Sequence, residues 1–220
     1  MAKLQPVALV FAGPVSRGTL GQLPGLRERL RWIKSSSVAT ATRAVRGLRA
    51  GVAVPDYADL SPAVIILISV PDDNVNTWAE VLANCGLSWH KKIAVLYDST
   101  WPSGALEPLR AVGAAIATLN YHPRPEQFVC EGDPIALRAL RDLAAGKPLI
   151  PLTSKERYFS ALRRTRDEFI PMFASCVADF RAAGMQKAAA EKAAAAALQE
   201  SVRSYVRAGH RVLNPLSRSN

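Results

Sequence analysis

The chain has 220 residues, of which 49% are hydrophobic and 21% charged. This length suits one large domain or two small ones, and the composition excludes an intrinsically disordered chain. Twenty-eight Lys and Arg residues against 18 Asp and Glu residues give a net charge of +10, which points to phosphate-bearing ligands, nucleic acid or anionic membranes.

The positive charge is concentrated at the two ends of the chain. Residues 1–55 carry nine basic residues and one acidic residue, whereas residues 56–150 carry seven basic and eleven acidic ones. Residues 151–220 carry twelve basic and six acidic ones.

The cysteine pattern and the hydropathy exclude several classes of protein. Cys85, Cys130 and Cys176 are far apart, and neither they nor the three histidines have the spacing of a zinc site. We therefore expect no metal and a reducing cytoplasm. The N-terminus does not read as a signal peptide. No apolar run approaches the ~18–20 residues of a membrane span, so no membrane association is expected.

Apolar strands alternate with amphipathic helices over residues 6–152. Short apolar runs predict strands at 6–12, 31–34, 63–70, 93–97, 114–120, 128–131 and, as an edge strand, 148–151. Helical spacing and capping residues predict helices at 19–30, with an interruption at Pro24, from Ser36 or Ser37 to about 49, and at 73–84, 103–112 and 134–145. This alternation predicts an α/β doubly wound, mostly parallel sheet of the Rossmann-like type.

The character of the chain changes after Thr153. Helices are predicted at 155–168 and 169–183, with a kink or boundary at Pro171, and at 187–207 after Gly184. We therefore expect two domains, an α/β domain over 1–152 and an all-helical domain over 153–220. So small a helical unit holds little core, so we expect it to pack on the first domain or in a homodimer.

The loop after the first strand stands where such folds place a G-x-G-x-x-G phosphate-binding turn. In that register Phe11 takes the first glycine position, Gly13 the second and Ser16 the third. Backbone and side-chain groups of Gly13, Val15, Ser16 and Arg17 are candidates for phosphate binding. The alternative is a plain turn in a domain that has lost its cofactor.

The end of the second strand favours NADP over NAD. NAD-binding domains carry an acidic residue here for the ribose hydroxyls, but this chain has Lys34 and Ser36, followed by Arg43. Cationic and hydroxyl side chains suit the 2′-phosphate of NADP. The alternative is a solvated basic helix face.

Further candidates follow the next strands, at the carboxyl edge where ligands bind to open α/β sheets. Val70, Pro71 and Asp72 are placed beside a nicotinamide, and Ser99 and His122 beside a substrate. His122 is a candidate proton donor. The alternative is a loop histidine without a role. Ser99 lacks a G-x-S-x-G context, which disfavours a hydrolase.

The order of several motifs resembles bacterial NADP-oxidoreductase-like proteins that combine a Rossmann-like domain with a helical domain of unknown function. They are relatives of pyrroline-5-carboxylate reductase, 6-phosphogluconate dehydrogenase and β-hydroxyacid dehydrogenases. The resemblance covers almost the whole chain and rests on 63–72 (AVIILISVPD), 96–114 (LYDSTWPSGALEPLRAVGA), 128–134 (FVCEGDP), 173–184 (FASCVADFRAAG) and 209–218 (GHRVLNPLSR).

The resemblance implies a role for the first helix of the second domain. In the wider dehydrogenase group a Lys and an Asn of this helix transfer a proton and orient the substrate, which makes Lys155 a catalytic candidate and Asp167 a doubtful counterpart of the Asn. Tyr158 matches the family's pattern, whereas Phe159 replaces a His.

The leading hypothesis is an NADP-dependent oxidoreductase-like protein that transfers a hydride to a small, unidentified substrate and is weakened by its incomplete glycine pattern. Lys155, His122 and Ser99 are its catalytic candidates. The alternative is a non-catalytic Rossmann-like protein that binds a ligand or another protein. Nucleic-acid binding ranks third, because the basic run at 155–166 reads as a charged helix face and no recognition motif accompanies it.

Overall fold

The computed structural model describes residues 5–13 and 20–208. The chain divides into two compact units, Met1–Phe159 and Ser160–Asn220. Three of the predicted phosphate-binding residues, Val15, Ser16 and Arg17, lie outside the described residues.

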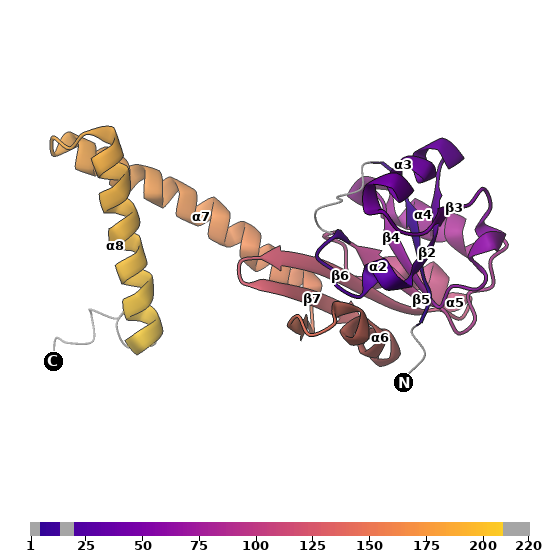
Figure 1. Cartoon of the computed structure of the whole chain (residues 1–220). Helices are drawn as coiled ribbons and strands as arrows, with labels where there is room; N and C mark the ends of the chain where they lie inside the picture. The colour runs from indigo at the N-terminus through magenta and orange to yellow at the C-terminus, as the bar shows by residue number, and fades with distance from the viewer. Residues whose placement is uncertain (1–4, 14–19, 209–220) are drawn as a thin grey trace. The chain divides into compact units, whose positions relative to one another are not determined.

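The first unit is built on an eight-stranded sheet in the order β3-β2-β1-β4-β5-β6-β7-β8 (Figure 1). All neighbouring strands are parallel except β6 and β7, which confirms the predicted mostly parallel α/β sheet. The strands are β1 (Val7–Phe11), β2 (Leu30–Ser35), β3 (Val52–Ala53), β4 (Ile65–Ser69), β5 (Ile93–Tyr97), β6 (Ala115–Pro123), β7 (Glu126–Gly132) and β8 (Leu149–Pro151).

Helices connect and follow these strands. They are α2 (Leu26–Arg29), α3 (Val38–Leu48), α4 (Val75–Ala83), α5 (Glu107–Ala111), α6 (Pro134–Ala144), α7 (Lys155–Ala182) and α8 (Lys187–Ala208), with 3₁₀ turns η1 (Tyr57–Leu60), η2 (Asp72–Asn74) and η3 (Ser103–Leu106). Ser37 caps α3 by accepting a hydrogen bond from the Thr40 N–H, as the sequence predicted.

Both faces of the sheet are covered, which explains why its central strands are apolar throughout. Val7 and Leu9 of β1 belong to the core that includes residues of α3 and α6, whereas Ala8 and Val10 belong to the core that includes residues of α4 and α5. All five residues of β1 are buried. A parallel strand buried on both faces reads as a continuous apolar run rather than an alternating one.

The strand order creates a switch point between β1 and β4. The chain runs outward from β1 through β2 to β3 and then returns to form β4 on the other side of β1. In such sheets the crevice for ligands lies at the carboxyl ends of the two central strands. Gly13 follows β1 there, and Val70, Pro71 and Asp72 follow β4.

The structure settles two details of the predicted helices. In the helical segment expected over 19–30, with an interruption at Pro24, helix α2 covers Leu26–Arg29, because Pro24 and Gly25 form a turn whose Gly25 N–H donates to the Leu143 carbonyl at 3.2 Å. Of the kink or boundary expected at Pro171, the boundary is absent, since α7 continues through it. Pro171 is exposed, so water can hydrate the carbonyl group that loses its helical partner.

The second unit contains the part of α7 that starts at Ser160 and the whole of α8. A turn around Gly184, whose φ is +95°, joins the two helices. Ala190 and Ala194 of α8 are completely buried, but apolar side chains such as Ile170 and Val202 are more than half exposed. Within the part of the chain described here, no helix is long and apolar enough to cross a membrane.

We predict that Gly132→Ala destabilises the first unit by about 2–3 kcal/mol in urea unfolding. Gly132 ends β7 at φ +145°, and an added Cβ would lie 2.5 Å from the Ala117 Cα and closer still to the Ile116 carbonyl oxygen. Gly104→Ala is the control. Its Cβ meets nothing within 4 Å, so we expect a change within about 0.5 kcal/mol. Equal effects of the two substitutions would contradict the prediction.

Candidate active site

The ends of β1 and β4 meet at the switch point. The Ala12 N–H donates to the Ser69 carbonyl at 3.0 Å, which continues the pairing of the two strands past β1. Gly13 has φ +77°, and a Cβ built on it would touch the Pro71 ring at 3.4 Å. Two predicted cofactor residues, Gly13 and Pro71, therefore lie next to each other at this edge, where a left-handed backbone favours glycine.

Asp72 links the ends of β4 and β5. Its carboxylate accepts hydrogen bonds from the Ser99 hydroxyl at 2.5 Å, the Thr100 N–H at 3.1 Å and the Thr100 hydroxyl at 2.6 Å. Burial raises the pKa of Asp72, but the hydrogen bonds from Ser99 and Thr100 and the positive charge of Lys155 outweigh it and leave the pKa below its ordinary value. Asp72 is therefore an ionised hydrogen-bond acceptor.

Ser99 is buried, and both its hydroxyl and its carbonyl group take part in hydrogen bonds. Its hydroxyl donates to Asp72 and accepts from the Trp101 N–H at 3.1 Å, while its carbonyl accepts from the Asn120 side-chain amide at 2.9 Å. A serine held in this way orients neighbouring groups. Its proton is already committed to a carboxylate, so the geometry favours a positioning role.

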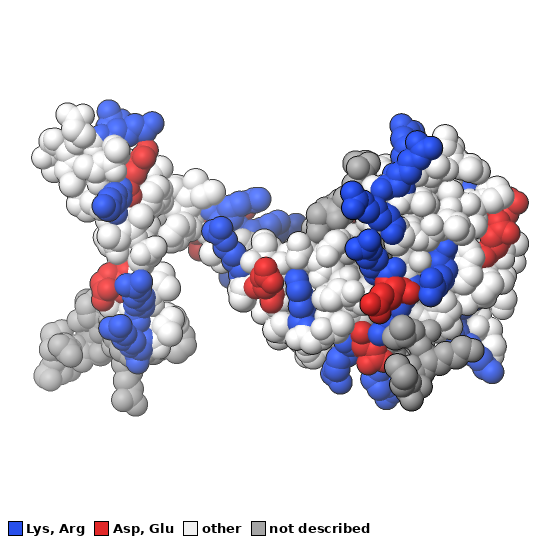
Figure 2. Space-filling model, viewed as in Figure 1, with Lys and Arg blue, Asp and Glu red and all other residues white. Residues whose placement is uncertain are grey.

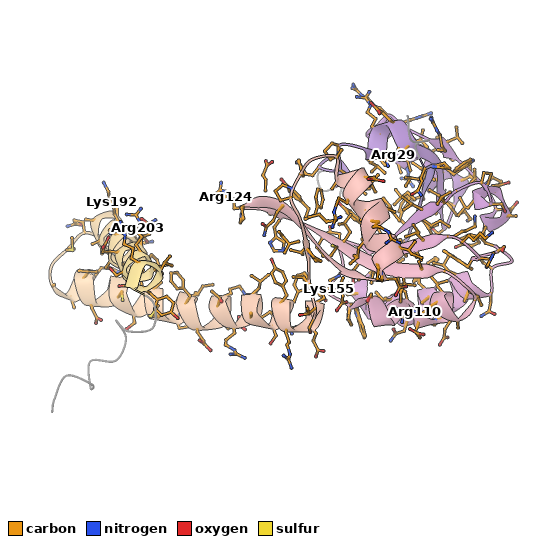
Figure 3. All side chains as sticks on the ribbon, turned by 90° about the horizontal axis from the view of Figure 1, so that it is seen from below. Arg29, Arg110, Arg124, Lys155, Lys192 and Arg203 are labelled. Atoms are coloured by element: carbon orange, nitrogen blue, oxygen red, sulfur yellow. The ribbon has the colours of Figure 1, made fainter. Side chains whose placement is uncertain are left out.

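Lys155 begins α7 and is 1% exposed (Figure 3). Its Nζ atom has no hydrogen-bond partner among the described residues and lies 5.7 Å from the centre of the Phe159 ring. Burial lowers the pKa of Lys155 to about 8, against the opposing negative charges of Glu131, Asp72 and Asp98. An amine with this pKa exchanges its proton close to neutral pH, which suits a general acid or base.

Glu131 is a residue of this site that the sequence interpretation missed. One oxygen of its carboxylate accepts the Ser103 N–H at 2.8 Å and the other accepts the Lys155 N–H at 3.1 Å. The signal was available in the sequence, because Glu131 directly follows the apolar run 128–130 and precedes a Gly-Asp-Pro turn.

Two further buried polar atoms lie on the same face of the sheet as Glu131. Thr118 is directly opposite Glu131 in the β6–β7 pairing, and Asn120 is two residues further along β6. The Thr118 hydroxyl and the Asn120 Oδ1 have no hydrogen-bond partner among the described residues. Buried polar groups are rarely left unpaired, so unpaired atoms here favour a place for water or a polar ligand.

His122 makes a different contact from the one predicted. Its Nε2 lies 3.1 Å from the Tyr158 hydroxyl, and the two rings meet edge to face at 5.4 Å. The contact joins the end of β6 to the first turn of α7. The structure thus joins Ser99 to Asp72 and His122 to Tyr158 by hydrogen bonds, and Asp72 acts on Lys155 through its charge.

The predicted NADP-selecting residues lie at the end of β2 and on α3. The Lys34 Nζ donates to the Ser35 carbonyl at 2.6 Å and lies 4.8 Å above the centre of the Tyr57 ring. Ser36 and Arg43 are exposed, and Arg43 donates to the Thr40 hydroxyl at 3.3 Å. Ser36 and Arg43 are therefore accessible to a ligand, whereas the Lys34 ammonium is already engaged by the adjacent backbone carbonyl.

Other basic residues of the N-terminal segment are also exposed. Figure 2 shows blue side chains over the region that Figure 1 labels α2 and α3. No ion pair among residues 5–13 and 20–208 involves the arginines of this segment, which are the half-buried Arg29 and the exposed Arg27, Arg31, Arg43, Arg46 and Arg49. Across the same ranges, no group of three His, Cys, Asp or Glu side chains is arranged to hold a metal ion.

Comparisons with solved structures support the predicted resemblance, although neither protein-family models nor curated proteins match the chain. A pyrroline-5-carboxylate reductase from Coxiella burnetii is 14% identical, with a TM-score of 0.56, and the alignment covers 96% of this chain and 85% of that one. An imine reductase from Pseudomonas sp. is 14% identical, with a TM-score of 0.64 and coverage of 94% and 77%.

An imine reductase from Aspergillus terreus, in complex with NADPH4, is 12% identical, with a TM-score of 0.66 and coverage of 97% and 77%. At these identities the likeness concerns the fold. The chain has the fold of these reductases, a Rossmann-like sheet followed by a helical part.

Proposed function

We propose that this protein is an NADP-dependent oxidoreductase that transfers a hydride to a small substrate at the carboxyl edge of its sheet. The observation that carries the proposal is the buried amine of Lys155, which has no hydrogen-bond partner among the described residues and is acted on by the negative charges of Glu131, Asp72 and Asp98. Perturbed, desolvated titratable groups of this kind are concentrated at functional sites. The three unpaired cysteines are in keeping with a cytoplasmic location.

The described residues fit a dinucleotide in two places. Gly13 has no side chain to block the approach of a phosphate to the backbone beside Pro71. The loop before α3 presents the exposed Ser36 to a 2′-phosphate, and the second turn of α3 presents the exposed Arg43. Phe11, which occupies the first glycine position, is 3% exposed and packs into the core, so its ring is directed away from this space.

The residues of the site divide the remaining work. When bound, the nicotinamide supplies the hydride. Lys155 holds a proton at Nζ that a substrate atom accepts as it is reduced, while Asp72 keeps the Ser99 loop in place. His122 on β6 and Tyr158 in the first turn of α7 form a polar pair near Lys155 in the sequence of that helix.

The alternative function is non-catalytic binding of a ligand or protein by the same fold. It is favoured by the glycine pattern, of which only Gly13 remains, and by Phe159 in place of a histidine. Binding of NADP without any hydride transfer to or from imines, alcohols or hydroxyacids would favour this alternative.

Isothermal titration should show NADP binding more tightly than NAD. Arg43→Ala should weaken NADP binding about tenfold and leave NAD binding unchanged, since it removes one charge-assisted phosphate contact. Arg46→Ala, one turn further along α3 and equally exposed, is the matched control and should behave like the wild type. No binding of either nucleotide at millimolar concentration would overturn the cofactor assignment.

Lys155→Met should increase the stability of the protein, by about 3 kcal/mol at pH 7, because a pKa lowered from 10.5 to about 8 means that folding penalises the charged amine. The folded protein binds the proton less tightly than the unfolded chain. The penalty is complete below pH 8 and disappears as the pH rises towards 10.5. Urea unfolding at pH 6.5 and 9.5 should therefore show a larger gain at the lower pH.

Lys92→Met is the control for this experiment. Lys92 is also buried, but its ammonium donates to the carbonyls of Ser61 at 2.6 Å and Ala63 at 2.8 Å. Its replacement should destabilise the protein by about 1–3 kcal/mol. Destabilisation by Lys155→Met at both pH values would mean that Lys155 serves the fold rather than the chemistry.

We also propose that the protein is a homodimer. A groove of about 500 Å³ between α7 and α8 is lined mainly by apolar side chains, including those of Phe169, Phe173, Leu198 and Val202. A two-helix unit with so little buried core gains stability by covering such a surface.

Light scattering should give about twice the chain mass of 23.7 kDa. Val202→Glu should shift the protein towards the monomer, because it places a charge in the groove. Ser201→Glu introduces the same charge one residue earlier, outside the groove lining, and should leave the mass unchanged. A wild-type mass of one chain would refute the dimer.

A further inference from the structure

The carboxylate of Glu131 joins two segments that are far apart in the sequence. It accepts the Ser103 N–H at the start of η3 with one oxygen and the Lys155 N–H at the start of α7 with the other. The first N–H groups of a helix have no partner within it, so a single side chain satisfies a donor at the start of each segment.

The position of Glu131 is itself determined by the sheet. Residue 131 pairs with Thr118 near the end of β7, and the next residue, Gly132, pairs with Ala117. The close approach of Gly132 to β6 leaves no space for a Cβ. Glu131 is therefore held by two paired strands rather than by a loop.

Three negative charges act on the Lys155 amine. Asp72 and Asp98 follow β4 and β5, and Glu131 lies on β7. The Asp72 oxygens are already engaged by Ser99 and Thr100. Glu131 also makes a direct hydrogen bond to Lys155, because its carboxylate accepts the Lys155 backbone N–H.

We propose that Glu131 positions Lys155, fixing the first turn of α7 through the backbone hydrogen bond and keeping the buried amine protonated through its negative charge. This assignment deepens the oxidoreductase proposed above and rests on it for its catalytic meaning. Glu131 acts through Lys155, so it is a positioning residue and makes no contact with substrate or cofactor.

The test measures the titration of Lys155 in the full-length protein without any nucleotide. The ¹³Cε resonance of Lys155, in lysine-labelled protein, is identified by its absence from Lys155→Met and followed from pH 6 to 10. Glu131→Gln keeps an oxygen acceptor but removes the charge, so the pKa of Lys155 should fall by about one unit. Glu126→Gln on the same strand is the control, because Glu126 is exposed and pairs with Lys147.

Glu131→Asp separates the two parts of the proposal. It keeps the charge, so the pKa of Lys155 should stay within about 0.5 units of the wild type. The shorter side chain cannot bridge both amides, so hydrogen exchange at the Ser103 and Lys155 N–H groups should accelerate about tenfold. If Glu131→Gln does not fold, the exchange rates in Glu131→Asp decide the matter.

Two outcomes would overturn the assignment. One is a Glu131→Gln titration that differs from that of Glu126→Gln by less than about 0.3 units, since an opposite charge next to an amine shifts its pKa by more than that. The other is unchanged amide exchange in Glu131→Asp. Neither readout depends on NADP, so a failure to bind NADP would refute the proposed function and leave the Glu131 result standing.

Discussion

Burial of the Lys155 amine is the constraint on which the candidate site depends. An ammonium group without hydrogen-bond partners is costly in a protein interior, and this chain offsets the cost with carboxylates from three different segments. Asp72 and Asp98 follow the neighbouring parallel strands β4 and β5, and Glu131 lies on β7, which β6 separates from β5. The site is therefore an electrostatic arrangement assembled across the sheet.

The same carboxylates also hold the backbone together at this edge. Asp72 ties the residue after β4 to the loop after β5, and Glu131 ties η3 to α7. Each acid thus combines a structural role with an influence on the pKa of Lys155. Protonation of the site and the order of its loops are consequently coupled, and a change in one of these acids affects both.

The net charge of +10 does not by itself indicate a phosphate-binding site. Arg43 is our proposed contact for a 2′-phosphate, but the other exposed arginines of the first 55 residues are spread over α2, β2 and the end of α3. The site around Lys155 has the opposite character, with three acids around one base. The net charge of the chain therefore describes its surface and not its candidate catalytic centre.

The sequence by itself determined the elements and the class of fold. Continuous apolar runs such as 93–97 could be read directly as strands, because strands buried on both faces of a parallel sheet carry no polar positions. Cap residues such as Ser37 marked helix starts for a local reason. Asp72 and Ser99 were also candidates from the sequence, since they follow strands at the edge where ligands bind, whereas Lys155 became a candidate only through the family resemblance.

Only the tertiary structure decided how these residues act on one another. The hydrogen bond between Ser99 and Asp72 joins residues 27 positions apart, and Glu131 reaches Lys155 across 24 positions. The lowered pKa of Lys155 depends on burial by distant segments, which no local pattern records. Whether a helix ends at Pro24 or at Pro171 was likewise decided by the fold, because the surroundings of a proline determine whether a helix ends there. Residue type and local sequence indicate the candidate side chains, whereas tertiary packing determines their charge, their partners and their role.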